Sequence, residues 1–323
     1  MVHAIRVHST GGPDVLQWEE IEVGEPAANE VRLRQTAIGV NFIDVYQRKG
    51  LYELDLPYIP GSEAAGLVEA VGSAVDGLKP GDRVAYANAP GAYCEARLID
   101  ASRLVKLPLG VEDTSAAAVL LKGLTAEYLL RRTFAVQPGH IVLFHAAAGG
   151  VGLIACGWAA HLGATVIGTV GSQKKAELAA AHGCHHVIDY TREDFVARVS
   201  EITDGRGVDV VYDSVGKDTF PGSLDVLKPR GMWVSFGQSS GAVPEFSPLL
   251  LLQKGSLFAT RPSLFNYVST RAELDAATDA LFAAIDDGIV DAKPRQTFSL
   301  ENARDAHAAL ESRGTVGATV LTV

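Results

Sequence analysis

The chain has 323 residues, of which 47% are apolar and 20% are charged. That is about two domains' worth of residues, with enough apolar side chains for a sizeable core, so a small disulfide-stapled protein and a mainly disordered one are excluded. Because 38 acids against 28 bases give a net charge of -10, neither nucleic acid nor an anionic membrane is expected as a partner.

The first part of the chain, to about residue 122, contains short alternating runs separated by Gly and Pro. Such runs favour half-buried antiparallel strands. They occur at residues 31–34, 67–71, 83–86 and 97–99. We therefore predict a mainly β domain over residues 1–122.

From residue 123 the pattern changes to apolar strands in alternation with helices. The candidate strands are residues 141–145, 165–170, 186–189, 208–213, 231–236 and 256–260. Helical stretches such as Lys174–His182, Asp194–Ile202 and Pro248–Lys254 separate them. Strand and helix alternation of this kind predicts an α/β fold, with a six-stranded, doubly wound parallel sheet over residues 123–262.

The segment after Pro262 is expected to form helices at 271–287 and 301–312 and strands at 296–299 and 318–323. Residues 263–323 are too few to form a core of their own. We therefore expect this C-terminal segment to return to the N-terminal domain.

The stretch from Thr133 to Gln173 contains no Asp, Glu, Lys or Arg. Glycines, Pro138 and three histidines interrupt it, so we interpret it as a buried strand, a turn and a helix rather than a membrane span. The turn, Ala146 to Gly152, has the pattern A-x-G-x-x-G. Gly149 would let the backbone approach a pyrophosphate, and Gly152 would let the helix pack on the strand.

Glycines also occur in tight strand–helix turns for structural reasons alone, but this turn follows the first strand of the alternating series, which favours dinucleotide binding. An NAD site places an acid about 20 residues later. Here the second strand is followed by Lys174 and Lys175, with no acid before Glu177. The lysines could be simply solvated, yet in the first turn of a helix they oppose its dipole, so a 2'-phosphate partner and the cofactor NADPH are predicted.

Several segments resemble the zinc-less quinone oxidoreductase family, the zeta-crystallin group of the medium-chain dehydrogenase/reductase superfamily. They are Gly11–Leu16, Gly39–Asp44, Leu121–Ala126, Ala146–Gly152, Tyr212–Gly216 and Val234–Gly237. The resemblance covers essentially the whole chain. It implies a GroES-like catalytic domain, a Rossmann domain, a homodimer formed through the edge of the cofactor sheet, and the activity of the bacterial NADPH:quinone oxidoreductases.

The zinc alcohol dehydrogenases of this superfamily have a cysteine ligand in the Gly39–Asp44 motif and Gly-His-Glu where this chain has Gly61-Ser62-Glu63. Here Asn41 or Phe42 and Ser62 stand in the two ligand places. Because a catalytic zinc needs about three convergent ligands, we expect no metal. The cysteines, at positions 94, 156 and 184, are widely spaced and suit a reducing, cytoplasmic compartment.

The resemblance also implies cofactor contacts. Those near the nicotinamide are Asn41, Phe42, Tyr46, Thr125 and Tyr128; those at the pyrophosphate are Gly150 and Val151, beside Gly149; those at the adenosine phosphate are Gly171, Ser172, Lys175 and Tyr190; and further contacts are Ser214, Phe236, Gly237, Arg261 and Arg313. Ordinary alternatives stay open: Thr125 could begin a helix, Phe236 could be a core ring, and Arg261 and Arg313 could be solvated surface charges.

Hydride transfer to a quinone needs geometry more than a strong acid or a metal. Tyr46 and Tyr52 are the candidate hydrogen-bond donors to the developing oxyanion, although a tyrosine on a short amphipathic segment is more often a core or rim residue. An alternative activity is the NADPH-dependent reduction of a 2-alkenal, an enone or an enoyl thioester. An alternative of another class is a noncatalytic, crystallin-like protein that binds NADPH or RNA.

Overall fold

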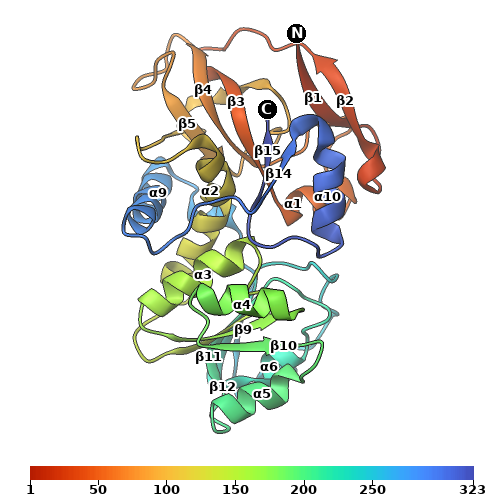
Figure 1. Ribbon diagram of the computed structural model, residues 1–323, viewed down its shortest axis with the longest axis vertical. Coiled ribbons are helices and arrows are strands. Elements are labelled where there is room, and N and C mark those ends of the chain that lie inside the picture. Colours follow the sequence, from red (N-terminus) through yellow and green to blue (C-terminus); the bar gives the residue numbers. More distant parts are fainter. The chain divides into compact units, whose positions relative to one another are not determined.

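The computed structural model describes residues 1–323, which divide into two compact units (Figure 1). Unit 1 contains Met1–Leu124, Thr270–Phe282 and Ala292–Val323, and unit 2 contains Thr125–Ser269 and Ala283–Asp291. Helices α2 (Asp113–Tyr128) and α9 (Arg271–Asp286) contribute residues to both. No helix combines the length and the hydropathy that a membrane crossing requires.

Unit 1 is built on a seven-stranded, mainly antiparallel sheet in the order β14-β15-β3-β4-β5-β7, with β6 beside β3. Its strands are β3 (Glu30–Val40), β4 (Glu63–Val71), β5 (Arg83–Ala87), β6 (Ala96–Asp100), β7 (Val105–Lys106), β14 (Gln296–Ser299) and β15 (Thr319–Thr322). Strands β1 (Val2–Val7) and β2 (Leu16–Ile21) form a separate antiparallel pair. The mainly β character predicted for the N-terminal residues is confirmed.

The C-terminal strand lies in the sheet of the N-terminal residues. β15 pairs antiparallel with β3, from Thr319 opposite Val40 to Thr322 opposite Ala37. β14 pairs parallel with β15 on its other side. Unit 1 also contains helices α1 (Phe42–Arg48) and α10 (Ala303–Glu311) and short 3-10 helices at Pro13–Val15, Ala101–Arg103 and Leu300–Asn302.

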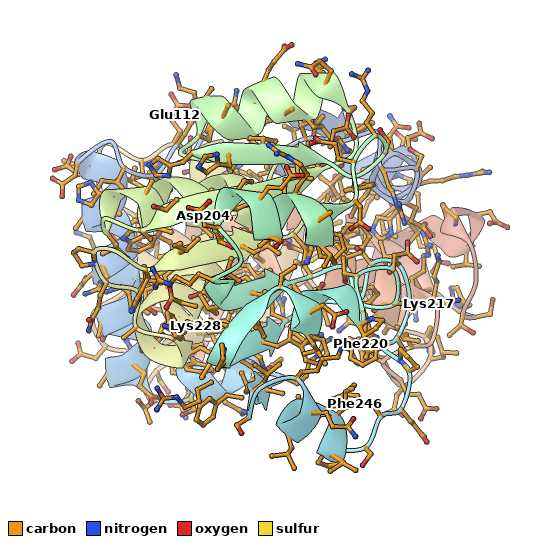
Figure 2. All side chains as sticks on the ribbon, turned by 90° about the horizontal axis from the view of Figure 1, so that it is seen from below. Glu112, Asp204, Lys217, Phe220, Lys228 and Phe246 are labelled. Carbon is orange, nitrogen blue, oxygen red and sulfur yellow. The ribbon has the colours of Figure 1, made fainter.

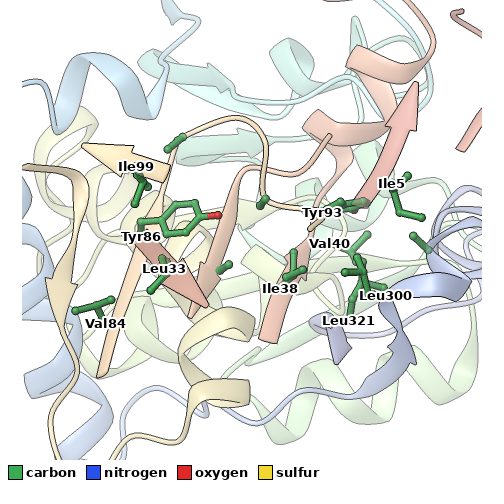
Figure 3. Packing of buried hydrophobic residues seen from close by; sticks show 14 of the residues in the cluster. Ile5, Leu33, Ile38, Val40, Val84, Tyr86, Tyr93, Ile99, Leu300 and Leu321 are labelled. Carbon is green, nitrogen blue, oxygen red and sulfur yellow. The ribbon is translucent and has the colours of Figure 1, made fainter. Parts of the chain in front are cut away.

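The core of unit 1 lies against the inner face of this sheet. Along β3, Val31 and Leu33 are buried whereas Arg34 is exposed, which is the period of two expected for a strand with one face in the core. Figure 3 shows Leu33 in one buried cluster with side chains from both ends of the chain, including Ile5 and Leu321. Burial of this set joins the C-terminal segment to the N-terminal strands.

Unit 2 is a six-stranded sheet in the order β10-β9-β8-β11-β12-β13, with every pairing parallel. Its strands are β8 (Ile141–Phe144), β9 (Thr165–Val170), β10 (His186–Asp189), β11 (Val208–Asp213), β12 (Leu227–Ser235) and β13 (Phe258–Thr260). This is the 3-2-1-4-5-6 strand order of a dinucleotide-binding Rossmann fold, so the predicted fold class is confirmed.

Helices cover both faces of this parallel sheet. α3 (Gly150–His161) and α4 (Gln173–Ala181) lie on one face, and α5 (Phe195–Ile202) and α6 (Gly222–Asp225) lie on the other (Figure 1). The remaining helices of unit 2 are α7 (Leu249–Gln253), α8 (Leu264–Tyr267) and a π-helical turn at Leu129–Thr133. The order of the strands reverses between β8 and β11, which is where such sheets bind ligands.

An aromatic cluster covers part of β12 in unit 2. The ring of Phe220 lies 5.6 Å from the ring of Trp233 and 5.2 Å from that of Phe246 (Figure 2). These contacts hold the loop that contains Phe246 against the sheet.

Candidate active site

Asn41 occupies the junction between β3 and α1 in unit 1. β3 ends at Val40 and α1 begins at Phe42, so Asn41 is the N-cap residue of the helix. Its backbone N–H donates to Oδ2 of Asp44 at 2.9 Å. An acid in the first turn also suits the positive end of the helix dipole. Asn41 is therefore held in one position by the start of α1.

Three aromatic rings follow Asn41 along the chain. The rings of Phe42 and Tyr46 lie 6.0 Å apart, and those of Tyr46 and Tyr52 lie 5.8 Å apart in an edge-on arrangement. Phe42 and Tyr46 are half-buried, whereas Tyr52 is 38% exposed. The structure thus brings both predicted tyrosine donors together near Asn41.

The side chain of Glu63 connects Asn41 to Lys122. Its Oε1 accepts from Nδ2 of Asn41 at 2.9 Å and from Nζ of Lys122 at 2.7 Å, and its Oε2 accepts from the backbone N–H of Leu121 at 2.7 Å. The Glu63 side chain is fully buried and that of Lys122 is 6% exposed. A buried charge of this kind requires such a partner.

The donor set around Asn41 does not fit a catalytic zinc. The Asn41 amide donates to Glu63, and the Ser62 hydroxyl donates to Oδ1 of Asp44 at 3.0 Å. The nearby ammonium of Lys122 would repel a metal cation. No group of three His, Cys, Asp or Glu side chains is placed to hold a metal ion.

A hydrogen-bonded chain runs from Asp44 to the C-terminal helix of unit 1. Arg48 donates to Nδ1 of His307 at 3.2 Å, and Nε2 of His307 lies 2.9 Å from the hydroxyl of Tyr93. The Tyr93 hydroxyl donates to Oδ2 of Asp44 at 3.1 Å. Because arginine can only donate, His307 must be neutral with its proton on Nε2. Arg48 also forms an ion pair with Glu311.

Two residues of this hydrogen-bonded chain, Asp44 and His307, have shifted pKa values. Burial raises the pKa of Asp44 to about 7, although hydrogen bonds from Asn41, Ser62 and Tyr93 oppose the shift. Burial, with the charge of Arg48, lowers the pKa of His307 to about 3. The Asp44 carboxyl group, in the first turn of α1, therefore titrates near neutral pH.

The glycine-rich turn in unit 2 has the shape that the sequence pattern predicts. Gly149 caps α3, and Gly150 and Val151 are its first residues, whose backbone N–H groups have no partner within the helix. A Cβ atom at Gly152 would lie 2.4 Å from the carbonyl oxygen of Ala146, so only glycine fits there. The turn offers N–H groups to an anion with the helix packed closely behind it.

The residues expected at the adenosine phosphate lie together after β9. Ser172 caps α4, and its hydroxyl accepts from the backbone N–H of Lys175 at 3.4 Å. Lys175 is half-buried in the first turn of α4, whereas Lys174 is exposed. A Cβ atom at Gly171 would lie 2.4 Å from the hydroxyl of Tyr190, so the tyrosine lies directly against the glycine backbone.

The remaining predicted contacts of unit 2 cluster at the ends of β11 and β12. A Cβ atom at Gly237 would lie 2.7 Å from the carbonyl oxygen of Ser214. Nη1 of Arg261 donates to the carbonyl oxygens of Ser235 at 3.0 Å and Gly237 at 2.8 Å. Arg261 is exposed but is hydrogen-bonded to the protein. The half-buried ring of Phe236 packs 5.7 Å from that of Phe144.

Thr125 does not begin a helix, because it lies within α2, which runs from Asp113 to Tyr128. The alternative reading of Thr125 as a helix-start residue is therefore wrong. Tyr128 follows one turn later, is 3% exposed and stacks on Tyr267 with ring centres 4.4 Å apart. In unit 1, Arg313 is exposed just after α10, with a φ of 58°.

Sequence reasoning missed several buried polar residues that organise these regions. Lys122 is one, although its position as the only charge between Asp113 and Glu127, among apolar residues of α2, could have indicated a buried partner. His145 and Asp213 are others: Asp213 is the last residue of β11 and His145 directly follows β8, both at the carboxyl edge of the parallel sheet. No local pattern indicates Tyr93 and His307, because 214 residues of chain separate these hydrogen-bonded partners.

Comparison with known proteins identifies the family of this chain. Residues 27–138 match the family described as the alcohol dehydrogenase GroES-like domain, and residues 150–280 match the family described as zinc-binding dehydrogenase. A quinone oxidoreductase of Pseudomonas aeruginosa is 51% identical over 323 residues, and a 2-haloacrylate reductase of a Burkholderia species is 48% identical over 332. Each alignment covers 99% of both chains.

A solved structure shows the same relationship. The quinone oxidoreductase of Escherichia coli, crystallised in complex with NADPH, superposes with a TM-score of 0.97 and 50% identity, covering 99% of this chain and all of that one. The chain therefore belongs to the quinone oxidoreductase family of the medium-chain dehydrogenase/reductase superfamily.

Proposed function

We propose that this protein is an NADPH:quinone oxidoreductase. The observation that supports this most directly is the pairing of a glycine turn at the N-terminus of α3 with Lys175 at the N-terminus of α4. The first suits a pyrophosphate and the second a 2'-phosphate. The NADPH complex of the Escherichia coli relative gives independent support.

The residues of unit 2 would hold the charged end of the cofactor. Gly150 and Val151 present backbone N–H groups to the pyrophosphate, and Gly149 lets the backbone approach it. Ser172 and Lys175 bind the 2'-phosphate beside Tyr190. When bound, NADPH supplies a hydride from its nicotinamide. The contacts proposed for the rest of the cofactor are Thr125, Tyr128, Gly171, Ser214, Phe236, Gly237, Arg261 and Arg313.

In unit 1, Asn41, Phe42 and Tyr46 are proposed to contact the nicotinamide end, and Tyr46 or Tyr52 to donate a hydrogen bond to the oxyanion that forms as the quinone is reduced. Quinones accept hydride without a Lewis acid, so we propose a zinc-independent reaction. Measurement of the metal content by mass spectrometry should find no stoichiometric zinc, and chelators should leave the activity intact. Loss of activity on chelation would contradict this.

Steady-state turnover tests the proposed activity. The purified protein should oxidise NADPH with 1,4-benzoquinone and with naphthoquinones, and it should use NADH less efficiently. Absence of NADPH oxidation with every quinone would overturn the proposal.

A second candidate is the reduction of an activated C=C bond, because the Burkholderia relative at 48% identity is named a 2-haloacrylate reductase. An enal, an enone or an enoyl thioester would also be an acceptor of this class. Assays with 2-alkenals and 2-haloacrylate, run beside the quinones, separate the two. A kcat/KM for the alkenes far above that for quinones would reverse the ranking.

We also propose a homodimer formed through β13. This strand ends the parallel sheet, so one of its edges has no neighbouring strand. Phe258 on this strand is 57% exposed, and Leu252 on α7 is 63% exposed. Light scattering after size-exclusion chromatography should give twice the chain mass for the wild type and the single-chain mass for Phe258→Glu. A monomeric wild type would contradict the proposal.

The three cysteines are free and buried, which supports a reducing, cytoplasmic compartment as a further part of the proposal.

A further inference from the structure

Four buried side chains in unit 2 form a continuous hydrogen-bonded chain. Nδ1 of His145 lies 2.9 Å from the hydroxyl of Thr169, and its Nε2 lies 3.1 Å from the hydroxyl of Ser223. The Ser223 hydroxyl donates to Oδ2 of Asp213 at 2.8 Å. All four residues are at most 2% exposed.

Hydrogen-bond accounting fixes the direction of this chain. The single hydroxyl proton of Ser223 goes to Asp213, so its oxygen must accept from His145. His145 therefore has its proton on Nε2, and its Nδ1 accepts from the Thr169 hydroxyl. Burial lowers the pKa of His145, which agrees with this neutral form.

The arrangement is not a hydrolytic triad. In such a triad the serine donates to the histidine, which prepares its oxygen to attack a substrate. Here the serine donates to the aspartate, and Ser223 and Asp213 are fully buried. These four buried side chains cannot touch a substrate, so any role in the reaction must act through the groups that they position.

The groups that these side chains position are the turns at the carboxyl edge of the sheet. His145 directly precedes Ala146, which begins the glycine turn with a φ of 56°. The backbone N–H of Ala147 donates to the carbonyl oxygen of Thr169 at 3.0 Å. Oδ1 of Asp213 accepts from the backbone N–H of Val215 at 2.9 Å and of Gly216 at 3.1 Å, which fixes the turn that follows β11.

We propose that His145, with Thr169, Ser223 and Asp213, forms a positioning device that fixes the pyrophosphate turn and the turn after β11 for the bound dinucleotide. This inference rests on the proposed function, since it assumes that these turns bind the cofactor. It adds residues to which no cofactor role has been assigned above. Because the pyrophosphate is common to NADPH and NADH, the device should affect both cofactors equally.

Thr169→Val tests the proposal with little risk to folding, because valine has the same shape and favours strands. The variant leaves Nδ1 of His145 without its donor. We expect the dissociation constants of NADPH and NADH, measured by fluorescence titration of the full-length protein, to rise by the same factor of about three to ten, the range of one hydrogen bond. The kcat at saturating NADPH should be unchanged, and Thr169→Ser should restore binding.

Thr203→Val is the matched control. Thr203 is also buried, and its hydroxyl donates to the carbonyl oxygen of Val199 at 2.8 Å, but it lies at the C-terminus of α5, away from the turns that begin after β8 and β11. It should lose stability without losing affinity. Ser223→Ala provides a second test and should weaken both dinucleotides as Thr169→Val does.

Other outcomes would overturn the inference. These are unchanged affinity in both Thr169→Val and Ser223→Ala, a loss confined to NADPH, failure of Thr169→Ser to restore binding, or an equal loss in Thr203→Val. Binding of NADPH by the wild type together with any of these results refutes the positioning role alone. Failure of the wild type to bind either dinucleotide would refute the proposed function, and this inference with it.

Discussion

Both units of the protein contain a buried aspartate linked to a neutral histidine, but the two carboxyl groups have opposite pKa shifts. In unit 1, Asp44 accepts from the backbone of Asn41 and from the hydroxyls of Ser62 and Tyr93. Its pKa is raised to about 7. The pKa of Asp213 in unit 2 is instead lowered.

The donors explain the difference. Burial raises the pKa of Asp213 too, but the hydrogen bonds that the carboxylate accepts, including those from Gly216, Thr219 and Ser223, lower it by a larger amount. Two backbone N–H groups, two hydroxyls and the indole N–H of Trp233 face this carboxylate. Hydrogen bonds to a carboxylate favour its charged form, so their number decides which effect prevails. Asp213 is therefore a fixed charge, whereas Asp44 changes protonation near neutral pH.

The largest expected effect is that of Asp213→Asn on stability. An amide at this position would present N–H groups to donors that now face an anion. We expect the free energy of unfolding in urea at pH 7 to fall by about 3 kcal/mol, because hydrogen bonds to a buried charge are lost. Asp44→Asn should cost less at the same pH. Equal losses in the two variants would remove the distinction between the carboxyl groups.

The next largest expected effect is a change with pH in the stability of Asp44→Asn relative to wild type. Because the folded pKa of about 7 lies above the ordinary value of 3.8, the folded state keeps a proton that the unfolded state releases between these values. Wild-type stability therefore falls as the pH rises through this window, and asparagine does not titrate. The free energy of unfolding of the variant relative to wild type should rise by about 2 kcal/mol between pH 5 and pH 8.

Asp213→Asn is the control for this measurement. Its folded pKa is depressed, so the stabilisation it provides is complete above the unfolded value and is lost only in more acidic solution. Its difference from wild type should stay constant between pH 5 and pH 8. A flat profile for Asp44→Asn as well would show that Asp44 is ionised throughout.

The sequence predicts the parallel sheet well because its strands are short, mainly apolar runs that alternate with helical stretches. β9, β10 and β11 begin and end at the predicted residues. A glycine lies one to three residues before each of them, at positions 163, 183 and 207. β12 instead begins at Leu227 and continues through Pro229 and Arg230, residues that suggest a turn. Its pairing with β11 shifts register there, which accommodates them.

The candidate site is less predictable than the fold. The glycine turn and Lys175 follow from local spacing, because one strand–turn–helix unit contains each. The partners of Asn41 do not, since Glu63 and Lys122 meet only after β3, β4 and α2 have packed. The apolar residues around Lys122 suggest that it is buried, but nothing in the sequence identifies Glu63 as its partner.

Lys175→Ala extends the comparison of the units from stability to cofactor binding. Loss of one charge-assisted hydrogen bond to the 2'-phosphate should raise the KM for NADPH about tenfold. The KM for NADH should change little, because NADH lacks that phosphate. The neighbouring Lys174→Ala, which removes an exposed lysine in the same helical turn, is the matched control. Equal changes in KM for both cofactors would show that Lys175 does not bind the 2'-phosphate.

The smallest expected effect lies in unit 1, where a variant should alter turnover rather than NADPH binding. Tyr46→Phe removes a hydroxyl but keeps the ring that contacts Phe42 and Tyr52. If that hydroxyl donates to the forming oxyanion, kcat with a quinone should fall by about threefold, with the KM for NADPH unchanged.

Tyr58→Phe is the control, because the buried hydroxyl of Tyr58 has no hydrogen-bond partner and its removal should not affect turnover. Tyr52→Phe, assayed beside Tyr46→Phe, identifies which of the two contacting tyrosines donates. An unchanged kcat in both single variants and in the double variant would show that neither hydroxyl assists. The proton would then come from water, and the role of α1 would be limited to placing Asn41 and the aromatic rings.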